Sequence, residues 1–301
     1  MTFKKFAEVY DEVMDQSVYA DWLSFTKKNI DSYAKRPINN CLELACGTGA
    51  IARMLAKDGF NVVGLDLSED MLAVAREKAM IDSLEELEDW ELLEILKGED
   101  GVDLAEGFKA LDDWNLASSA SEAQGSSKKK SKNKSTSGTL EWLQGDMCDL
   151  SSLNKCDMVT LYSDSLCYLT DFNQTKQVFK TVYDCLEEGG LFLFDVHSWH
   201  QMTEVFPGYQ YNYTVDDLAF LWQSYEYEWP GSVEHVVQMF IEDEDGKFNR
   251  FEEVHVERTF PMDDYLRELK AVGFDFIDVQ ENFGEGPVTA DASRWFFVCR
   301  K

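Results

Sequence analysis

The chain has 301 residues, of which 45% are hydrophobic, so it is long enough for one large domain with additions or for two small domains. Its 57 Asp and Glu residues outnumber its 28 Lys and Arg residues and give a formal net charge of -29. Such an acidic surface repels phosphate backbones and anionic lipids, which argues against a nucleic-acid substrate and against docking on a membrane.

The 7 cysteines are scattered without a C-x-x-C pair, and several lie in apolar stretches, as reduced core residues of a cytosolic protein do. The first residues, MTFKKFAEVYDEVMDQ, are acidic where a signal peptide needs an apolar block, and no apolar run approaches bilayer length. We therefore predict a cytoplasmic protein. The spacing of His and Cys indicates no metal site.

Two helical patterns fill residues 3–35. Apolar side chains recur at Phe3, Phe6, Val9 or Tyr10, and Val13, and then at Tyr19, Trp22, Leu23 and Ile30. Aromatic residues at this spacing are usually core residues of amphipathic helices, so we expect two helices that pack against the rest of the chain.

Residues 40–71 read NCLELACGTGAIARMLAKDGFNVVGLDLSEDM. An apolar run over 41–46, interrupted by Glu43, predicts a strand that is followed by a glycine turn and a helical pattern. A second apolar run, over 62–65, ends at Asp66. Strand, helix and strand in this order predict a βαβ unit with two parallel strands.

The glycine turn and Asp66 predict a site for a cofactor that contains a nucleoside. Gly47 and Gly49 allow a sharp turn and bring bare N–H groups against a ligand, while the helix N-terminus beyond them carries partial positive charge. Asp66, at the carboxyl end of the second strand, is placed to accept hydrogen bonds from two ribose hydroxyls.

This sequence pattern is compatible with two classes of cofactor. Gly47, Gly49 and Ala52 also satisfy the loose dinucleotide motif G-x-G-x-x-G/A. A dinucleotide site does not require an acid just before the glycines, whereas Glu43 stands there. The string ELACGTG, continued by GLDLSEDML, resembles the first motif of the class I S-adenosylmethionine-dependent methyltransferases, in which an acid precedes the glycine turn.

This resemblance implies S-adenosylmethionine as the cofactor and a set of residues that bind it. The residues expected to hold its methionine part are Glu43, Ala45, Gly47 and Gly49, and Asp66 is expected to hold its ribose. The residues expected around its adenine are Leu67, Asp146 and Met147. Tyr162 and Ser163 are expected beside the sulfonium. The segment YDEVMDQSVYADW resembles one that closes over the cofactor in small bacterial members of the superfamily, so the residues expected to line the site from above are Tyr10, Tyr19 and Trp22.

After the βαβ unit, a helix is predicted over 68–80, and the next strand is then delayed. Residues 81–117 carry two acidic helical patterns, and 118–138 are a Ser/Lys-rich tether of low complexity. We interpret 81–138 as an acidic helical insertion. Its helices have an apolar face that must be buried, which makes 81–117 a candidate surface for a protein partner or for self-association.

Strands and helices alternate again from residue 139. The expected elements are a strand ending at Asp146, a buried strand over 158–162, a helix over 174–187 stopped by Gly189 and Gly190, and a strand over 191–196. The alternation predicts an α/β fold with a doubly wound, mostly parallel sheet. We assign the cofactor-binding methyltransferase domain to residues 1–80 and 139–197, completed by 259–301.

Residues 198–258 change to the period-two alternation of antiparallel strands, as in VEHVVQMFIE and FNRFEEVHVERTF, with EDEDGK as a hairpin turn. This β insertion is too long for a simple loop, and we interpret it as a lid over the acceptor. A helix over 262–272 and a final strand over 295–299 return the chain to the sheet.

Methyl transfer from a sulfonium is an in-line displacement, which needs alignment and a desolvated path more than a strong acid. Asp164 and His197 lie just past two predicted strands, where an acceptor would sit, and are candidate catalytic residues. The string EVHVERTF, followed by PMDDYLRELKAVGF, resembles a region of methyltransferases that act on small molecules, including amino-sugar N-methyltransferases. His255 is therefore a third candidate catalytic residue, and we expect a small-molecule acceptor.

Two other functions are compatible with parts of the sequence. A nicotinamide-dependent oxidoreductase is disfavoured by Glu43 and by the absence of a second nucleotide-binding half. A non-catalytic interaction protein that binds the cofactor would use residues 81–117 as its partner surface.

Overall fold

The computed structural model describes residues 5–85 and 138–301. Residues 86–137, which include most of the predicted acidic helices and the predicted tether, lie outside the described part. The chain divides into two units, residues 1–77 with 137–301 and residues 78–136. The fold presented below is that of the first unit.

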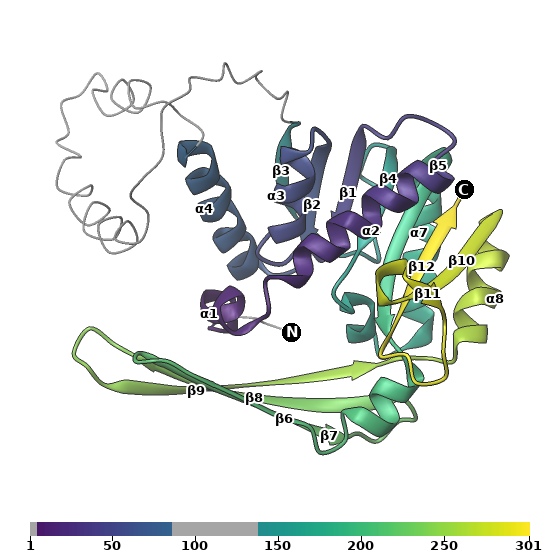
Figure 1. Ribbon diagram of the computed structural model, residues 1–301. Coiled ribbons are helices and arrows are strands. Elements are labelled where there is room, and N and C mark those ends of the chain that lie inside the picture. The colour runs from purple at the N-terminus through teal and green to yellow at the C-terminus, as the bar shows by residue number, and fades with distance from the viewer. Residues whose placement is uncertain (1–4, 86–137) are drawn as a thin grey trace, which may run out of the picture. The chain divides into compact units, whose positions relative to one another are not determined.

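The described residues form a sheet A of eight strands in the order β11-β10-β12-β5-β4-β1-β2-β3 (Figure 1). Its strands are β1 (Asn40–Leu44), β2 (Asn61–Asp66), β3 (Leu140–Gln144), β4 (Cys156–Leu161), β5 (Leu186–His197), β10 (Phe276–Glu281), β11 (Gly286–Pro287) and β12 (Arg294–Arg300). Strands β1 to β5 pair in parallel, whereas β12 lies antiparallel between β5 and β10. The predicted doubly wound, mostly parallel sheet is thereby confirmed.

Helices cover both faces of sheet A (Figure 1). They are α2 (Val18–Tyr33), α3 (Ala50–Lys57), α4 (Glu69–Glu85), α7 (Phe172–Cys185) and α8 (Met262–Val272). Successive strand residues point to opposite faces, so Met158 and Leu193 pack in one apolar cluster with α2 and α3. Their neighbours Val159 and Phe194 pack in another cluster with α7 and α8. Burial on both faces explains why β4 is buried along its whole length.

The residues after β5 form a second, antiparallel sheet B, in the order β6-β7-β8-β9. Its strands are β6 (Gln210–Thr214), β7 (Leu218–Glu226), β8 (Ser232–Glu242) and β9 (Phe248–Arg258). One face packs against α1 (Phe6–Val13), and the shared apolar cluster includes Phe6, Val9, Phe220, Val237 and Met239. Because only that face is buried, these strands alternate between apolar and polar residues.

Short helical turns join the larger elements. They are a 3₁₀ turn η2 (Ser165–Tyr168), a π-helical turn η3 (Gln201–Val205) and a 3₁₀ turn η4 (Asn282–Gly284). None of the helices in the described part combines the length and the apolar character needed to cross a membrane.

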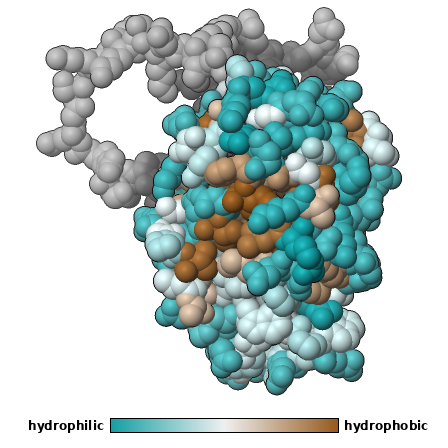
Figure 2. Space-filling view, turned by 90° about the vertical axis from the view of Figure 1, so that its right-hand side faces the viewer, coloured by the Kyte–Doolittle hydropathy of each residue, from teal (hydrophilic) through white to brown (hydrophobic). Residues whose placement is uncertain are grey.

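The structure differs from the sequence prediction at two places in sheet A. The helix predicted over 174–187 ends at Cys185, and Gly189 and Gly190 lie within β5, where the pairing with β4 shifts in register. Strand β10 was not predicted. It lies near the edge of the sheet, beyond which β11 contributes two residues, so its side chains are mostly half-buried and lack a clear alternation. Figure 2 shows this side of the molecule, where an apolar area is bordered by hydrophilic residues.

The glycine turn after β1 gives a first prediction. Gly47 and Gly49 both have positive φ, 56° and 75°, which costs a side-chain-bearing residue about 1 kcal/mol or more. A Cβ at Gly49 would also overlap the Trp142 ring, whereas a Cβ at Gly47 meets no atom within 4 Å. We expect Gly49→Ala to lower the free energy of unfolding by about 2–4 kcal/mol, since overpacking adds to the backbone strain.

Gly47→Ala serves as the matched control, with an expected loss of about 1 kcal/mol from backbone strain alone. Urea denaturation of the cofactor-free protein measures both values. Equal losses for the two variants would contradict the proposed contact with Trp142.

Candidate active site

A cavity of about 430 Å³ lies at the carboxyl ends of β1, β2 and β4, where the strand order of sheet A reverses direction. Open α/β sheets bind ligands at this switch point. The predicted residues that line it are Tyr10, Tyr19, Glu43, Ala45, Gly47, Asp66, Leu67, Asp146, Met147, Tyr162, Ser163, Asp164, His197 and His255. The structure thus brings together residues from the glycine turn, the N-terminal helices and sheet B.

Two predicted residues, Gly49 and Trp22, are not among the described residues that line the cavity. Gly49 precedes α3 and faces Trp142 and Ala75. Trp22 is buried, and its indole N–H donates a hydrogen bond to Asp195 at 3.0 Å. The spacing of aromatic residues in α2 indicated a buried face correctly but did not reveal which residue of that face borders the cavity.

The end of the cavity at β1 and β2 is built by the glycine turn and Asp66. The Asp66 carboxylate accepts hydrogen bonds from the backbone N–H groups of Gly47 and Ser68, each at 2.8 Å. The Thr48 hydroxyl donates to Asp11 of α1 at 2.8 Å, which connects the turn to the N-terminal helix. These contacts hold the turn in the position that leaves the Gly47 backbone open to a ligand.

Glu43 is the second acid at this end. Its side chain is 3% exposed, and its Oε2 atom has no hydrogen-bond partner among the described residues. Burial raises the pKa of Glu43 to about 8, although a hydrogen bond with the Ala52 backbone opposes this shift. A buried carboxyl oxygen without a partner is costly, so the site favours a ligand that brings a cationic or N–H group to Glu43.

These observations fit S-adenosylmethionine. Its amino group would satisfy the Oε2 atom of Glu43, and its ribose hydroxyls would donate to Asp66. Leu67 lines the cavity although 60% of this apolar side chain is exposed, which suits an adenine ring that would cover it.

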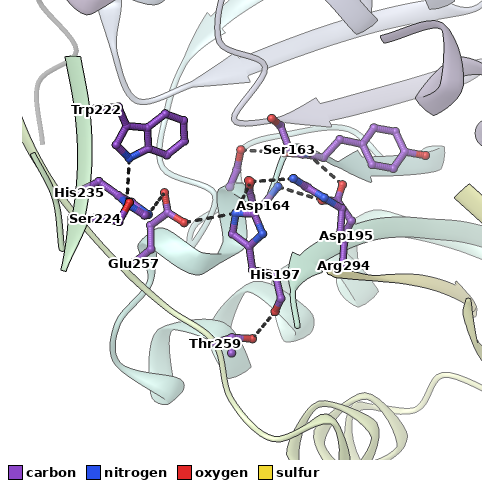
Figure 3. Close-up of polar contacts among 12 residues, drawn as sticks. Ser163, Asp164, Asp195, His197, Trp222, Ser224, His235, Glu257, Thr259 and Arg294 are labelled. Carbon is purple, nitrogen blue, oxygen red and sulfur yellow. Dashed lines mark hydrogen bonds and ion pairs between the residues drawn. The ribbon is translucent and has the colours of Figure 1, made fainter. Parts of the chain in front are cut away.

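The opposite end of the cavity depends on a buried ion network around Asp195 (Figure 3). Besides the Trp22 indole, its carboxylate accepts the backbone N–H groups of Ser163 and Asp164, each at 3.0 Å, and pairs with Arg294. Ser163 and Asp164 both have positive φ, 56° and 51°. Asp195 therefore holds the loop after β4 in a strained conformation, as is common in active sites.

Asp164 lies between a guanidinium and an imidazole. Its Oδ2 atom is 3.1 Å from Nη2 of Arg294 and 2.8 Å from Nε2 of His197. Burial alone would raise the pKa of Asp164, but the two neighbouring basic groups lower it below its ordinary value. Asp164 therefore stays ionised and is better suited to orient His197 than to take up a proton.

His235 has its ring proton on the nitrogen that faces the cavity. Its Nδ1 atom accepts a hydrogen bond from the Trp222 indole at 3.1 Å, and an indole only donates. Burial lowers the pKa of His235 to about 3, so the ring is neutral and its proton is on Nε2. The Nε2 atom is 3.9 Å from Oε1 of Glu257.

Glu257 lies between His235 and His197 (Figure 3). Its Oε2 atom is 3.8 Å from Nε2 of His197, and Tyr168 hydrogen-bonds the carboxyl group. Burial, followed by the charge of Asp164, raises the pKa of Glu257 well above its ordinary value. Within the described ranges, no group of three His, Cys, Asp or Glu side chains has a geometry suited to a metal ion.

His255 also faces the cavity from β9. Its Nε2 atom is 3.5 Å from Oε2 of Glu253, and its ring packs against Phe6 and Tyr168. The other carboxyl oxygen of Glu253 accepts the backbone N–H groups of Lys5 and Phe6 at the start of α1. His255 is therefore at the junction between sheet B and α1.

The sequence did not reveal several residues of the acceptor end, notably Tyr168, Trp222, Glu257 and Arg294. The alternation of β9 places Glu257 on the same face as His255, which is a signal that the sequence contains. Arg294 comes from β12, about 100 residues after β5 in the chain, and only the strand pairing brings it to Asp195.

Comparisons with known proteins agree with this geometry. Residues 41–96 match a family model described as a methyltransferase domain. A protein of Geobacillus sp. (strain WCH70) that is named as a methyltransferase is 31% identical over 301 residues, covering 100% of both chains.

Solved structures establish the fold. A structure of an S-adenosylmethionine-dependent methyltransferase from Clostridium acetobutylicum ATCC 824 has a TM-score of 0.70 and 22% identity, with 98% of this chain and 97% of that chain covered. The sugar N-methyltransferase KedS8 from Streptoalloteichus sp ATCC 53650 has a TM-score of 0.63 and 19% identity, with 95% and 88% covered.

The raised pKa of Glu43 predicts a pH dependence of stability. Between about pH 5 and pH 8 the folded protein keeps a proton on Glu43 that the unfolded chain releases. The free energy of unfolding should therefore fall as pH rises, by at most about 1.4 kcal/mol per pH unit. In Glu43→Gln this decrease is absent, so the variant should gain stability relative to the wild type as pH rises.

Urea denaturation of the cofactor-free proteins at three pH values in this range measures the effect. Glu141→Gln, at an exposed position of β3, is the control and should follow the wild type. Parallel curves for wild type and Glu43→Gln would show that Glu43 ionises normally.

The ion network around Asp195 predicts that loss of Arg294 lowers the stability of the fold. Arg294→Met leaves the carboxylates of Asp164 and Asp195 without their guanidinium partner, which should cost about 3–5 kcal/mol at pH 8. The loss should shrink at pH 5, where the carboxyls can bind protons. Arg267→Met, which removes an exposed arginine paired with Asp264, should change the denaturation curve little at either pH.

Proposed function

The chain belongs to the S-adenosylmethionine-dependent methyltransferases, and from this premise we propose that it methylates a small-molecule acceptor bound between the glycine turn and sheet B. The observation that carries the proposal is the second end of the cavity, which is lined by the buried side chains of His197, His235 and Glu257. Buried polar groups in a concave pocket suit a small ligand better than an extended macromolecular surface. The likeness to the sugar N-methyltransferase KedS8 supports the same acceptor class.

S-adenosylmethionine, when bound, supplies an electrophilic methyl group on a sulfonium. We propose that Glu43 and Asp66 hold its amino and ribose groups, and that the adenine lies near Leu67, Asp146 and Met147. Ala45 and Gly47 would contribute backbone contacts to the methionine part, while Gly49 would act indirectly by shaping the turn.

The side chains near the reacting atoms would align the acceptor and exclude water. Tyr10, Tyr19 and Tyr162 line the cavity, and burial raises the pKa of Tyr10 to about 12, so its hydroxyl stays neutral. Neutral aromatic walls favour an in-line displacement in which the charge of the sulfonium is spread over the reacting atoms, because they stabilise the concentrated charge of the ground state less than water does. Sheet B and α1 would act as the lid of the acceptor end.

The three predicted catalytic residues receive different roles in this proposal. His197 is held by Asp164 at 2.8 Å and faces Glu257 at 3.8 Å, so it is the candidate for moving a proton from the acceptor end. Asp164 is a positioning residue for His197. His255 would shape the acceptor end where α1 meets β9.

The two alternative functions are not favoured. Membership of the methyltransferase family leaves no support for a nicotinamide-dependent oxidoreductase. The partner surface proposed for residues 81–117 falls mostly outside the described residues and stays a prediction.

Calorimetric titration with S-adenosylmethionine, S-adenosylhomocysteine and NADH in parallel tests the cofactor site. We expect micromolar binding of the first two and no binding of NADH, because Glu43 offers a site for an amino group and the glycine turn is not matched to a pyrophosphate. A screen with labelled methyl donor then compares small amines and hydroxy compounds with RNA and denatured protein. Label transfer to the macromolecules alone would refute the small-molecule acceptor.

A further inference from the structure

Glu257 and His235 each have a buried polar atom at the acceptor end that lacks a hydrogen-bond partner within the described part of the chain. These atoms are Oε2 of Glu257 and Nε2 of His235, whose residues are 6% and 2% exposed. Both residues line the cavity, and they project from the neighbouring strands β9 and β8. Buried polar atoms normally have a hydrogen-bond partner, so these two atoms indicate which hydrogen-bonding groups the ligand must supply.

The two atoms have opposite hydrogen-bonding character. The Nδ1 atom of His235 is occupied by the Trp222 indole N–H, which leaves a proton on Nε2 that can only be donated. The Oε2 atom of Glu257 accepts a hydrogen bond once an entering cation has replaced the proton of the carboxyl group. The 3.9 Å between Nε2 of His235 and Oε1 of Glu257 is too long for a direct hydrogen bond, so the two groups do not satisfy each other.

The charges around Glu257 favour a cation. Asp164, Asp195 and Glu257 contribute three carboxyl groups to the acceptor end, and among the described lysines and arginines Arg294 is the one that pairs with any of them. Arg294 already binds both Asp164 and Asp195. Within the described residues, the basic neighbours of Glu257 are therefore two histidines at 3.8 and 3.9 Å, of which His235 is neutral.

We propose that the methyl acceptor is an amine with an oxygen atom on the neighbouring carbon, bound by Glu257 through its nitrogen and by His235 through its oxygen. This inference rests on the proposed function and specifies its acceptor. Such a ligand offers an N–H donor and an oxygen acceptor side by side, and it satisfies both orphaned atoms at once.

Glu257 also has a chemical role in this arrangement. In the empty site Glu257 holds a proton, and an ammonium group that enters replaces this proton, which leaves to water. The Glu257 carboxylate then takes one proton from the ammonium group, which becomes a neutral amine. The nitrogen lone pair then forms the bond to the methyl carbon, while the electron pair of the broken C–S bond stays on sulfur. The methylated amine leaves as a cation, and Glu257 keeps the proton that it has taken up, as in the empty site.

A purely structural role for Glu257 is the competing explanation, because Tyr168 hydrogen-bonds its carboxyl group. The two explanations differ in a ligand preference. A structural glutamate does not discriminate between an amine and an alcohol of the same shape, whereas an amine-binding glutamate does.

The test uses the full-length protein saturated with S-adenosylhomocysteine and three probes of one ring size: cyclohexanol, cyclohexylamine and trans-2-aminocyclohexanol. Calorimetric titration should show affinity rising about tenfold from the alcohol to the amine and again to the amino alcohol, because each step satisfies one more buried atom. Glu257→Gln should remove the preference for the amine over the alcohol and leave S-adenosylhomocysteine binding unchanged.

Glu252→Gln is the matched control, since it removes the same charge from an exposed position of β9. Failure of S-adenosylhomocysteine to bind would count against the proposed function itself. With that ligand bound, equal affinities for the three probes, no binding of either amine up to 10 mM, or an unchanged preference in Glu257→Gln would overturn the inference. The comparison of probes on the wild-type protein is decisive even where the variant does not fold.

Discussion

The active site depends on one buried carboxylate, that of Asp195, and on the donors it binds. Its partners come from α2, from the loop after β4 and from β12, which are far apart in the chain. A buried carboxylate without partners costs several kcal/mol, so each donor helps to keep the others in place. The left-handed backbone at Ser163 and Asp164 persists because this carboxylate holds it. The orientation of His197 follows in turn, since Asp164 binds its ring.

The two ends of the cavity share one feature, a buried glutamate. Glu43 at one end and Glu257 at the other are buried carboxyl groups, each with an oxygen that lacks a hydrogen-bond partner in the described part of the chain. Burial raises the pKa of both. A cationic group that enters can replace the proton that each of them holds, so in a protein with a net charge of -29 they define two positions for cations. Glu43 is on β1 of sheet A and Glu257 is on β9 of sheet B, so the two sheets set the spacing of these positions.

The cofactor end was largely predictable from the sequence because its residues are close in the chain. Glu43, Gly47 and Asp66 belong to one βαβ unit, whose geometry is the same in many proteins. The acceptor end was less predictable from the sequence. Glu257 and Arg294 reach it only through the pairing of strands that are far apart in the chain. Trp22 illustrates an intermediate case. Helical periodicity indicated that its side chain is buried, but only the position of Asp195 shows that its indole N–H is bound there and not to a ligand.

The attachment of α1 to sheet B has a consequence for the order in which the protein is built. The start of α1 hydrogen-bonds Glu253, a residue 247 or 248 positions later in the chain, and its side chains complete the cavity above the glycine turn. During synthesis α1 is made long before its binding partner on β9. The helix therefore lacks this binding partner until β9 has left the ribosome. The cavity closes only after β9 has been made, so a product truncated before β9 lacks a finished site at both ends of the cavity.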